Sequence, residues 1–222
     1  MNTISEIVKN LDARDRLLYL VFIIFSVLFL LLQFFFNKYP GSFIIKVIPI
    51  LSLSILIIKN VRGIQGKLVL TGLLFSAAGD ITLEIDRVNY FIPGLIFFLT
   101  AHIFYIIAFI RKFKFSRKRL PAAVTILIYS GILAYILRDI RKDRIIPVMF
   151  YLLVISVMAL TALFVSTGNL IILMGALIFM ISDTIIAVNQ FLNPIPHSTL
   201  YNISLYYIAQ LMITTGFIGE SK

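Results

Sequence analysis

Long apolar runs separated by short polar segments dominate the chain, and each run is about long enough to cross a bilayer. Roughly 20 apolar residues span the hydrocarbon core as one helix, and the pattern predicts eight such helices. We expect them at about 17–36, 43–58, 68–84, 90–110, 120–137, 145–165, 170–190 and 200–218, after a charged leader at 1–16. The pattern predicts an all-α integral membrane protein with one transmembrane domain over residues 1–222.

The composition of the 222 residues agrees with this pattern. Hydrophobic residues make up 60% of the chain and charged residues 14%, against about 25% charged residues in soluble proteins. The net charge of +10 does not indicate nucleic-acid binding, because most Lys and Arg residues fall in short loops, where they meet anionic lipid headgroups. Cysteine is absent, which excludes disulfides, a thiolate nucleophile and a cysteine-based metal site.

The Lys and Arg residues also predict an orientation. The leader, the loops after helices two, four and six, and the C-terminus together hold 13, whereas the opposite set of loops holds 6. Basic loops stay in the cytoplasm, so we expect both termini there, in the plasma (inner) membrane of a prokaryote. The basic connector Arg138–Arg144 falls on the wrong side of this count.

A short internal repeat surrounds two aspartates in the third and seventh helices. Gly72 stands eight residues before Asp80, and Gly175 stands eight residues before Asp183. The copies are 103 residues apart, so the pattern predicts a parallel four-plus-four repeat with both aspartates at similar depth.

A carboxylate deep in a membrane helix costs about 2.5–3.5 kcal/mol on insertion scales. One explanation is that polar partners tie each aspartate and fix helix packing. The other is a polar cavity in which the pair serves as proton donor and acceptor, one of them protonated near neutral pH. We favour the second explanation.

Two charged residues belong to the same zone. Glu84 lies four residues after Asp80 and shares its helix face, although it would also suit the interfacial end of a helix. Lys46 interrupts the second predicted helix. It can extend to the interface, neutralise the carboxylates or bind a substrate phosphate.

Polar residues of the fourth and last helices complete the candidate site. His102 and Tyr105 share one face of the fourth helix, and an unpaired imidazole in mid-membrane is costly, so His102 is expected to position an aspartate, act directly or pack. Tyr206, Tyr207 and Gln210 lie on the last helix. Tyrosines near a helix end are common at the membrane interface, but Gln210 lies deeper. We expect no metal and no cofactor, because two histidines without cysteine make a poor zinc set.

These residues give the chain a resemblance to the YhhN family. The resemblance rests on an ordered set: Lys46 with Pro49, Gly72-Leu-Leu-Phe-Ser-Ala-Ala-Gly-Asp80, Phe91-x2-Gly94-x3-Phe98-x3-His102-x2-Tyr105, Tyr151 through Ala162, Gly175 through Asp183, and Tyr206-Tyr207-x2-Gln210. It covers about residues 43–216. One departure is the spacing of Lys46 and Pro49, because the family usually has lysine directly before proline.

The family includes lysoplasmalogenases, eight-helix membrane enzymes that hydrolyse the vinyl ether of lysoplasmalogens. The resemblance implies a lysophospholipid substrate and two products, a fatty aldehyde and glycerophosphoethanolamine or glycerophosphocholine. Vinyl-ether cleavage needs one acid and one nearby base or anion. We therefore hypothesise that Asp80 and Asp183 divide these roles, with His102 and Tyr207 orienting them and Lys46 near the phosphate.

Two other functions compete with this one. A proton-coupled transporter of a small or lipidic solute would use the aspartate pair as its proton site and would explain the repeat. A hydrolase of ester or amide bonds would ordinarily need a metal or a serine nucleophile. The sequence leaves the headgroup preference, the acid among the two aspartates and the oligomeric state open.

Overall fold

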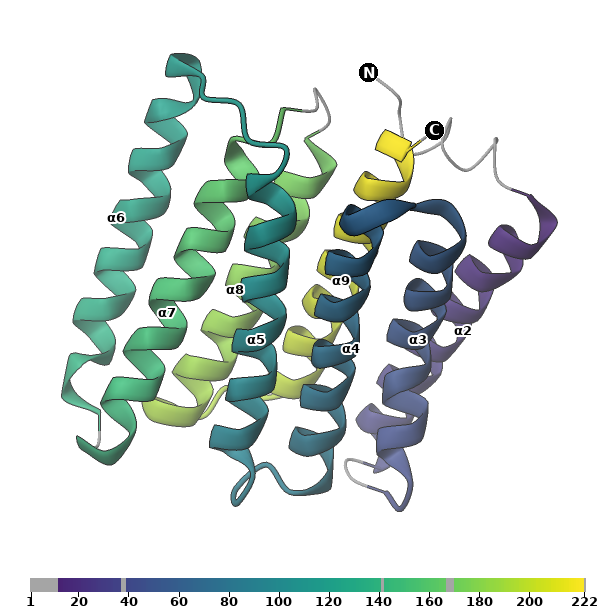
Figure 1. Ribbon diagram of the computed structural model, residues 1–222. Helices are drawn as coiled ribbons and strands as arrows, with labels where there is room; N and C mark the ends of the chain where they lie inside the picture. Colours follow the sequence, from purple (N-terminus) through teal and green to yellow (C-terminus); the bar gives the residue numbers. More distant parts are fainter. Residues whose placement is uncertain (1–11, 37–38, 141, 167–169, 222) are drawn as a thin grey trace.

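The computed structural model describes residues 12–36, 39–140, 142–166 and 170–221, and within them the chain forms a bundle of eight helices (Figure 1). The helices are α2 (Ala13–Phe36), α3 (Ser42–Asn60), α4 (Gly63–Ile85), α5 (Phe91–Ile110), α6 (Leu120–Ile136), α7 (Lys142–Leu163), α8 (Ile171–Phe191) and α9 (Ser198–Ser221). Two 3₁₀ turns, η1 (Arg117–Arg119) and η2 (Leu137–Asp139), flank α6. The predicted all-α class is confirmed.

Seven of the described helices, α2 to α8, are long and apolar enough to cross a membrane. Helix α9 has the length but carries more polar residues, among them Asn202, Gln210 and Thr214, which are all buried. It packs against α8, α3 and α2, so its polar groups face protein rather than lipid. This arrangement suits a membrane bundle, because polar side chains there turn toward the interior.

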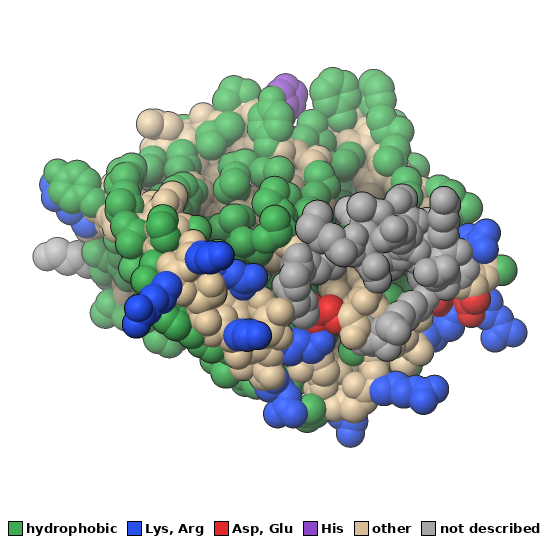
Figure 2. Space-filling view, turned by 90° about the horizontal axis from the view of Figure 1, so that it is seen from above, with side chains coloured by type: hydrophobic (Ala, Val, Ile, Leu, Met, Phe, Trp, Pro, Cys, Tyr) green, Lys and Arg blue, Asp and Glu red, His purple; other side chains and the backbone are tan. Residues whose placement is uncertain are grey.

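The connections are short, so neighbouring helices run antiparallel and the two ends of the described chain lie at the same end of the bundle (Figure 1). Figure 2 looks onto that end and shows Lys and Arg side chains over it and hydrophobic flanks. Residues 1–11 of the predicted leader and 167–169 of the predicted turn after the sixth helix lie outside the described residues.

Three helices begin three or more residues earlier than the apolar pattern predicts. Helix α2 begins at Ala13 rather than near residue 17, within the predicted leader; α4 begins at Gly63 rather than near residue 68, and α7 at Lys142 rather than near residue 145. The added turns contain charged or polar residues, and hydrophobicity alone does not mark a helical turn that projects beyond the lipid. The positive φ of Gly63, 71°, allows the sharp turn from α3 into α4.

The two halves of the bundle pack their helices in the same way. In the first half α2 packs on α3, α3 on α4 and α4 on α5; in the second half α6 packs on α7, α7 on α8 and α8 on α9. Across the halves α5 packs on α7 and, in the equivalent pairing, α9 packs on α3. This is the packing that a parallel four-plus-four repeat predicts.

Small residues bring the helices close around the buried aspartates. A Cβ atom added to Gly79, next to Asp80, would lie 2.7 Å from the Phe98 ring of α5. A Cβ atom on Gly175 would lie 3.0 Å from the backbone oxygen of Ala209 on α9. Such close approaches are the main source of helix association where lipid surrounds the bundle.

Charged groups tie the helix ends together at the end that carries the termini. The Asp15 amide donates to the Asp12 carboxylate at 2.6 Å and caps α2. This amide, and the charge of Lys59 at the end of α3, lower the pKa of Asp12. Lys59 also contacts Asp15 at 2.5 Å, and Lys112 pairs with Glu220 of α9.

Candidate active site

Asp80 lies in the interior of the bundle, 1% exposed, on the face of α4 that meets α3 and α9. Tyr206 of α9 donates its hydroxyl to Asp80 Oδ2 at 2.6 Å. The Lys46 ammonium of α3 lies 3.6 Å from Asp80 Oδ1. The carboxylate is therefore paired with a cation and hydrogen-bonded, which is how a buried charge is kept.

Lys46 joins Asp80 to a second carboxylate one turn away. Its ammonium, also 1% exposed, donates to Glu84 Oε2 at 3.2 Å. Ser42 donates to the other Glu84 oxygen at 2.8 Å, and Tyr207 donates to the Lys46 backbone carbonyl at 2.8 Å. Hydrogen bonds thus join Lys46, Glu84, Ser42 and Tyr207, and they hold α3 against α4 and α9.

A neutral hydrogen-bond chain lies one turn further toward the termini. Tyr105 of α5 donates to Gln210 Oε1 at 2.8 Å, and Gln210 donates in turn to Ser76 of α4 at 2.9 Å. All three side chains are buried. This chain links three helices and satisfies polar groups that would otherwise be costly in the bundle.

Asp183 of α8 has a different environment. Tyr151 of α7 donates to its Oδ2 atom at 2.5 Å. The Nε2 atom of His102 lies 3.9 Å from the same oxygen, too far for a hydrogen bond. The described residues place no Lys or Arg within ion-pair distance of this carboxyl.

His102 is fully buried, and neither ring nitrogen has a hydrogen-bond partner among the described protein groups. Its ring packs edge-on against Phe179 at 4.7 Å and against Tyr151 at 5.3 Å between ring centroids. An unpaired buried polar group costs about 1–3 kcal/mol. The imidazole is thus held in place by rings while its nitrogens stay available near Asp183.

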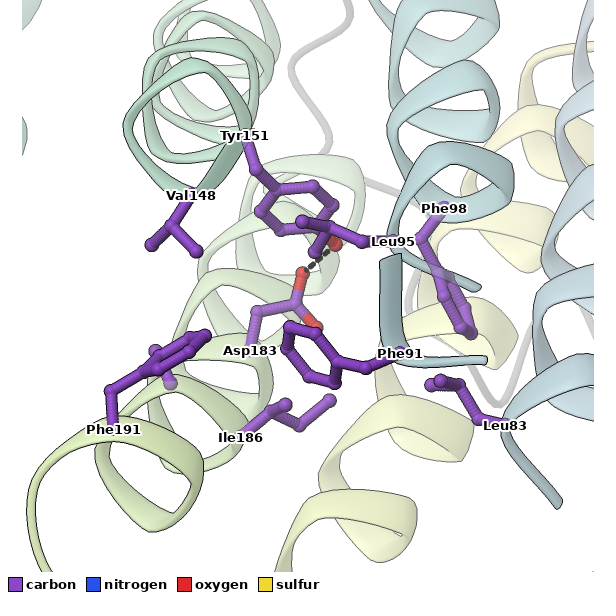
Figure 3. A pocket seen from close by; sticks show the side chains of 10 residues that line it. Leu83, Phe91, Leu95, Phe98, Val148, Tyr151, Asp183, Ile186 and Phe191 are labelled. Carbon is purple, nitrogen blue, oxygen red and sulfur yellow. Dashed lines mark hydrogen bonds between the residues drawn. The ribbon is translucent and has the colours of Figure 1, made fainter. Parts of the chain in front are cut away.

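Asp183 and Tyr151 form the polar part of a pocket that is otherwise apolar (Figure 3). The pocket has a volume of about 40 Å³ and lies between α4, α5, α7 and α8. Leu83, Leu95, Phe91 and Phe191 are among its walls. Figure 3 shows one Asp183 oxygen bound by Tyr151 and the other directed into the pocket.

A second pocket, of about 30 Å³, lies on the α6 side of the same carboxyl. Tyr151 and Asp183 line both pockets, together with Val148 and Ala187. The Tyr151–Asp183 hydrogen bond therefore stands between two apolar spaces.

The two carboxyl centres correspond under the four-plus-four repeat. Each aspartate faces one side chain from the preceding helix, Lys46 on α3 or Tyr151 on α7. Each also faces one side chain from the last helix of the opposite half, Tyr206 on α9 or His102 on α5. The arrangement is repeated, but the chemistry differs: the first centre contains a cation and the second has neutral partners and a pocket.

The predicted site residues fall into three groups in the structure. Lys46, Glu84, Tyr206 and Tyr207 surround Asp80; Tyr105 and Gln210 bond to each other; His102 faces Asp183. The Tyr207 hydroxyl bonds to a backbone carbonyl rather than to an aspartate. Lys46 does not extend to the interface, because two buried carboxylates hold its ammonium inside.

No described residue bonds to both aspartates. Between them lie rings that contact one another edge-on: Tyr206 packs on Phe179 at 5.4 Å, and Phe179 packs on His102 at 4.7 Å. The two carboxyls are linked by an aromatic wall and not by a shared hydrogen bond.

Three contributors were missed by the sequence analysis. Ser42 and Ser76 each precede a predicted residue, Lys46 or Asp80, by four positions, so helical spacing alone would have found them. Tyr151 begins one of the motifs behind the family resemblance, but no spacing along its own helix connects it to Asp183.

Two ionisable groups outside the spans adjoin the first centre. Burial, and then the Glu84 charge, raise the pKa of Tyr39 in the α2–α3 connection. Arg87 in the α4–α5 connection donates to Thr199 at 3.2 Å. Burial lowers the pKa of Arg87, whereas the Glu84 and Asp80 carboxylates act in the opposite direction.

Among the described residues, no three His, Asp or Glu side chains gather as a metal-binding cluster would require. The ionisable groups of the first centre are instead paired with each other and with hydroxyl groups. In the second centre, Asp183 accepts from Tyr151 and faces the pocket. The chemistry that this arrangement offers is proton transfer at Asp183 in an apolar site.

Comparison with known proteins gives consistent matches. A family model described as "YhhN family" matches residues 41–217. The human protein named lysoplasmalogenase TMEM86B is 33% identical over 175 residues, which are 77% of this chain and 73% of that protein. Human lysoplasmalogenase TMEM86A is 30% identical over 200 residues, 82% of this chain and 79% of that protein.

A bacterial relative extends the comparison. The lysoplasmalogenase of Mycobacterium tuberculosis is 32% identical over 168 residues, which are 70% of this chain and 62% of that protein. No solved structure shows a significant match.

Proposed function

Because the chain belongs to the YhhN family, we propose that it hydrolyses the vinyl ether bond of lysoplasmalogens. The products are a fatty aldehyde and glycerophosphoethanolamine or glycerophosphocholine. Relatives named lysoplasmalogenase, at about 30% identity over most of the chain, support this reaction. The structural observation that carries it is the Asp183 carboxyl, which faces an apolar pocket without a cationic partner among the described residues.

The reaction starts with transfer of one proton from Asp183 to the vinyl carbon that is not bonded to oxygen. The other vinyl carbon then becomes an oxocarbenium ion. Water adds to this carbon, and its proton goes to the Asp183 carboxylate, which restores the acid. The resulting hemiacetal then breaks the bond between this carbon and the ether oxygen, and its hydroxyl proton passes to that oxygen, so that one vinyl ether and one water give one aldehyde and one alcohol.

The surroundings of Asp183 suit this cycle. An apolar site favours the neutral acid over the carboxylate and so keeps a proton available. Tyr151 fixes one carboxyl oxygen and leaves the other for the substrate. His102, with free nitrogens 3.9 Å or more from the bound oxygen, positions the attacking water.

Asp80 has a supporting role in this proposal. Its charge is engaged by Lys46 and Tyr206, and Tyr206 braces Phe179, on which His102 packs. The separate partners of the two aspartates favour Asp183 for both proton steps, rather than a division of acid and base between them. Lys46 is engaged in the same centre and is therefore assigned to Asp80 rather than to the phosphate.

We also propose an orientation for the membrane bundle, in the inner membrane of a prokaryote. Both termini lie in the cytoplasm, and the support is that most of the described Lys and Arg residues lie at the end of the bundle where the described chain begins and finishes. Asp183 then lies toward the opposite leaflet.

The test uses the purified protein in nanodiscs with two substrates, a lysoplasmalogen and its saturated 1-O-alkyl analogue. Aldehyde release is followed by a coupled alcohol dehydrogenase. We expect aldehyde from the vinyl ether and none from the saturated ether. Failure to release aldehyde, with proton-dependent uptake of a solute into vesicles, would identify a transporter instead.

A further inference from the structure

Helix α6 leaves one of its flanks open to the membrane. It packs along α7, whereas its counterpart α2 in the first half packs on both α3 and α9. The open flank forms a groove with α8, of about 330 Å³, at the lower end of the roughly 300–1,000 Å³ typical of ligand sites. Its wall includes Ala122, Thr125 and Tyr129 from α6 and Leu173, Leu177 and Met180 from α8.

This groove continues toward Asp183. Met180 lines the groove and also the second pocket, in which Asp183 and Tyr151 lie. At the boundary, Tyr129 of the groove and Thr184 of the pocket are hydrogen-bonded at 2.7 Å. The groove therefore adjoins the pocket that contains the Asp183 carboxyl, with Met180 and the Tyr129–Thr184 hydrogen bond at the boundary.

The length of the route matches a lipid chain. From Leu173 to Asp183 the route follows ten residues of α8, about 15 Å at 1.5 Å per residue. One leaflet occupies about half of a hydrocarbon core that is roughly 30 Å thick. A chain lying in the groove would thus place its polar end at Asp183, with its methyl end toward the termini.

We propose that the α6–α8 groove binds the hydrocarbon chain of a single-chain lipid and guides its head-proximal end to Asp183. The occupant is an unbranched chain because the walls are almost wholly apolar and open sideways to lipid. This inference rests on the proposed function for the identity of the lipid. The groove itself is lined by α6 and α8, with Leu163 of α7.

Two substitutions on neighbouring positions of α6 test the groove. Thr125→Phe narrows it, and Val124→Phe adds a ring at the adjacent position, where Val124 is 52% exposed and does not line the groove. Threonine and valine have nearly the same shape, so the two variants add the same volume. Each is assayed with lysoplasmalogens that carry a 16-carbon or a 4-carbon alkenyl chain.

We expect Thr125→Phe to lower kcat/KM for the long chain by about tenfold or more, and to leave the short-chain value within about twofold. Val124→Phe should leave both values within about twofold. An equal loss for both chain lengths, or no loss, would overturn the groove proposal. If both variants change oligomeric state and kcat/KM does not depend on chain length, the α6–α8 face binds a second copy of this protein instead of a lipid chain.

A binding measurement separates this proposal from the proposed function. The saturated 1-O-alkyl lysolipid with a long chain should raise the Tm of the unmodified protein and of Val124→Phe, and should not raise that of Thr125→Phe. If this pattern holds while no vinyl ether is cleaved, the groove stands and the hydrolase function fails. If vinyl ether is cleaved and the saturated lipid stabilises all three proteins equally, the groove proposal fails alone.

Discussion

Asp80 is buried and Asp183 is partly buried, and the groups around the two carboxylates compensate a negative charge differently. Asp80 meets an ammonium at 3.6 Å and a hydroxyl at 2.6 Å, whereas Asp183 meets one hydroxyl at 2.5 Å and apolar walls. Removing one partner of a buried ion pair leaves the other charge uncompensated. Loss of the two carboxylates should therefore have different consequences for stability.

We predict that Asp183→Asn lowers vinyl-ether hydrolysis by about 10²-fold or more, the usual contribution of an acid or base. The Tm should change little, because asparagine has the same shape and its carbonyl oxygen can still accept from Tyr151. Asp80→Asn should lower both the Tm and the activity, and it should lower the free energy of unfolding by up to about 3–5 kcal/mol. Aldehyde release and thermal unfolding in detergent check both variants. An active Asp183→Asn protein would contradict the assignment of Asp183 as the acid.

His102 allows a test in which activity and stability move apart. We predict that His102→Phe lowers kcat by about 10–100-fold with little change in KM, because it removes the nitrogens that position water. The Tm should hold or rise, because a ring remains against Phe179 and an unpaired buried polar group is removed. His102→Gln, which restores a donor and an acceptor, should recover part of kcat. An unchanged kcat in His102→Phe would show that His102 serves only in packing.

At the scale of elements, helix contacts depend on where a glycine faces a neighbouring backbone. A Cβ atom on Gly175 of α8 would meet the Ala209 oxygen at 3.0 Å and the Ile213 nitrogen at 3.1 Å, whereas one on Gly131 of α6 would meet nothing within 4 Å. We predict that Gly175→Ala destabilises the fold by about 1–3 kcal/mol, and that Gly131→Ala is neutral or slightly stabilising. Unfolding in mixed micelles compares the two, and equal Tm values would contradict the close approach of α8 and α9.

The sequence predicted the helices well because lipid requires a long apolar run for each span. It also predicted shared faces within a helix, as for Asp80 and Glu84. It did not predict which helices face each other, so neutralising the carboxylates was one of three roles for Lys46, and the structure selects it. Nor did it predict the Tyr151–Asp183 bond, because helical spacing carries no information about a side chain on another helix.

At the scale of the whole molecule, charge is distributed unevenly between the two ends of the bundle. Among the described residues, the end at which the described chain begins and finishes carries 11 Lys and Arg residues and the opposite end carries four, with Lys46 buried between them. The α5–α6 connection alone holds six. Short basic loops are retained in the cytoplasm, so the larger count supports the proposed orientation.

The absence of cysteine makes this orientation directly measurable, because any introduced thiol is the only one in the chain. Val88→Cys lies in the α4–α5 connection, where Val88 is 75% exposed, and Lys118→Cys lies in η1 at the other end. We predict that an impermeant maleimide labels Val88→Cys on intact spheroplasts and Lys118→Cys only in inverted vesicles or after permeabilisation. The reverse pattern would place the termini outside, and Asp183 would then serve lipids of the cytoplasmic leaflet.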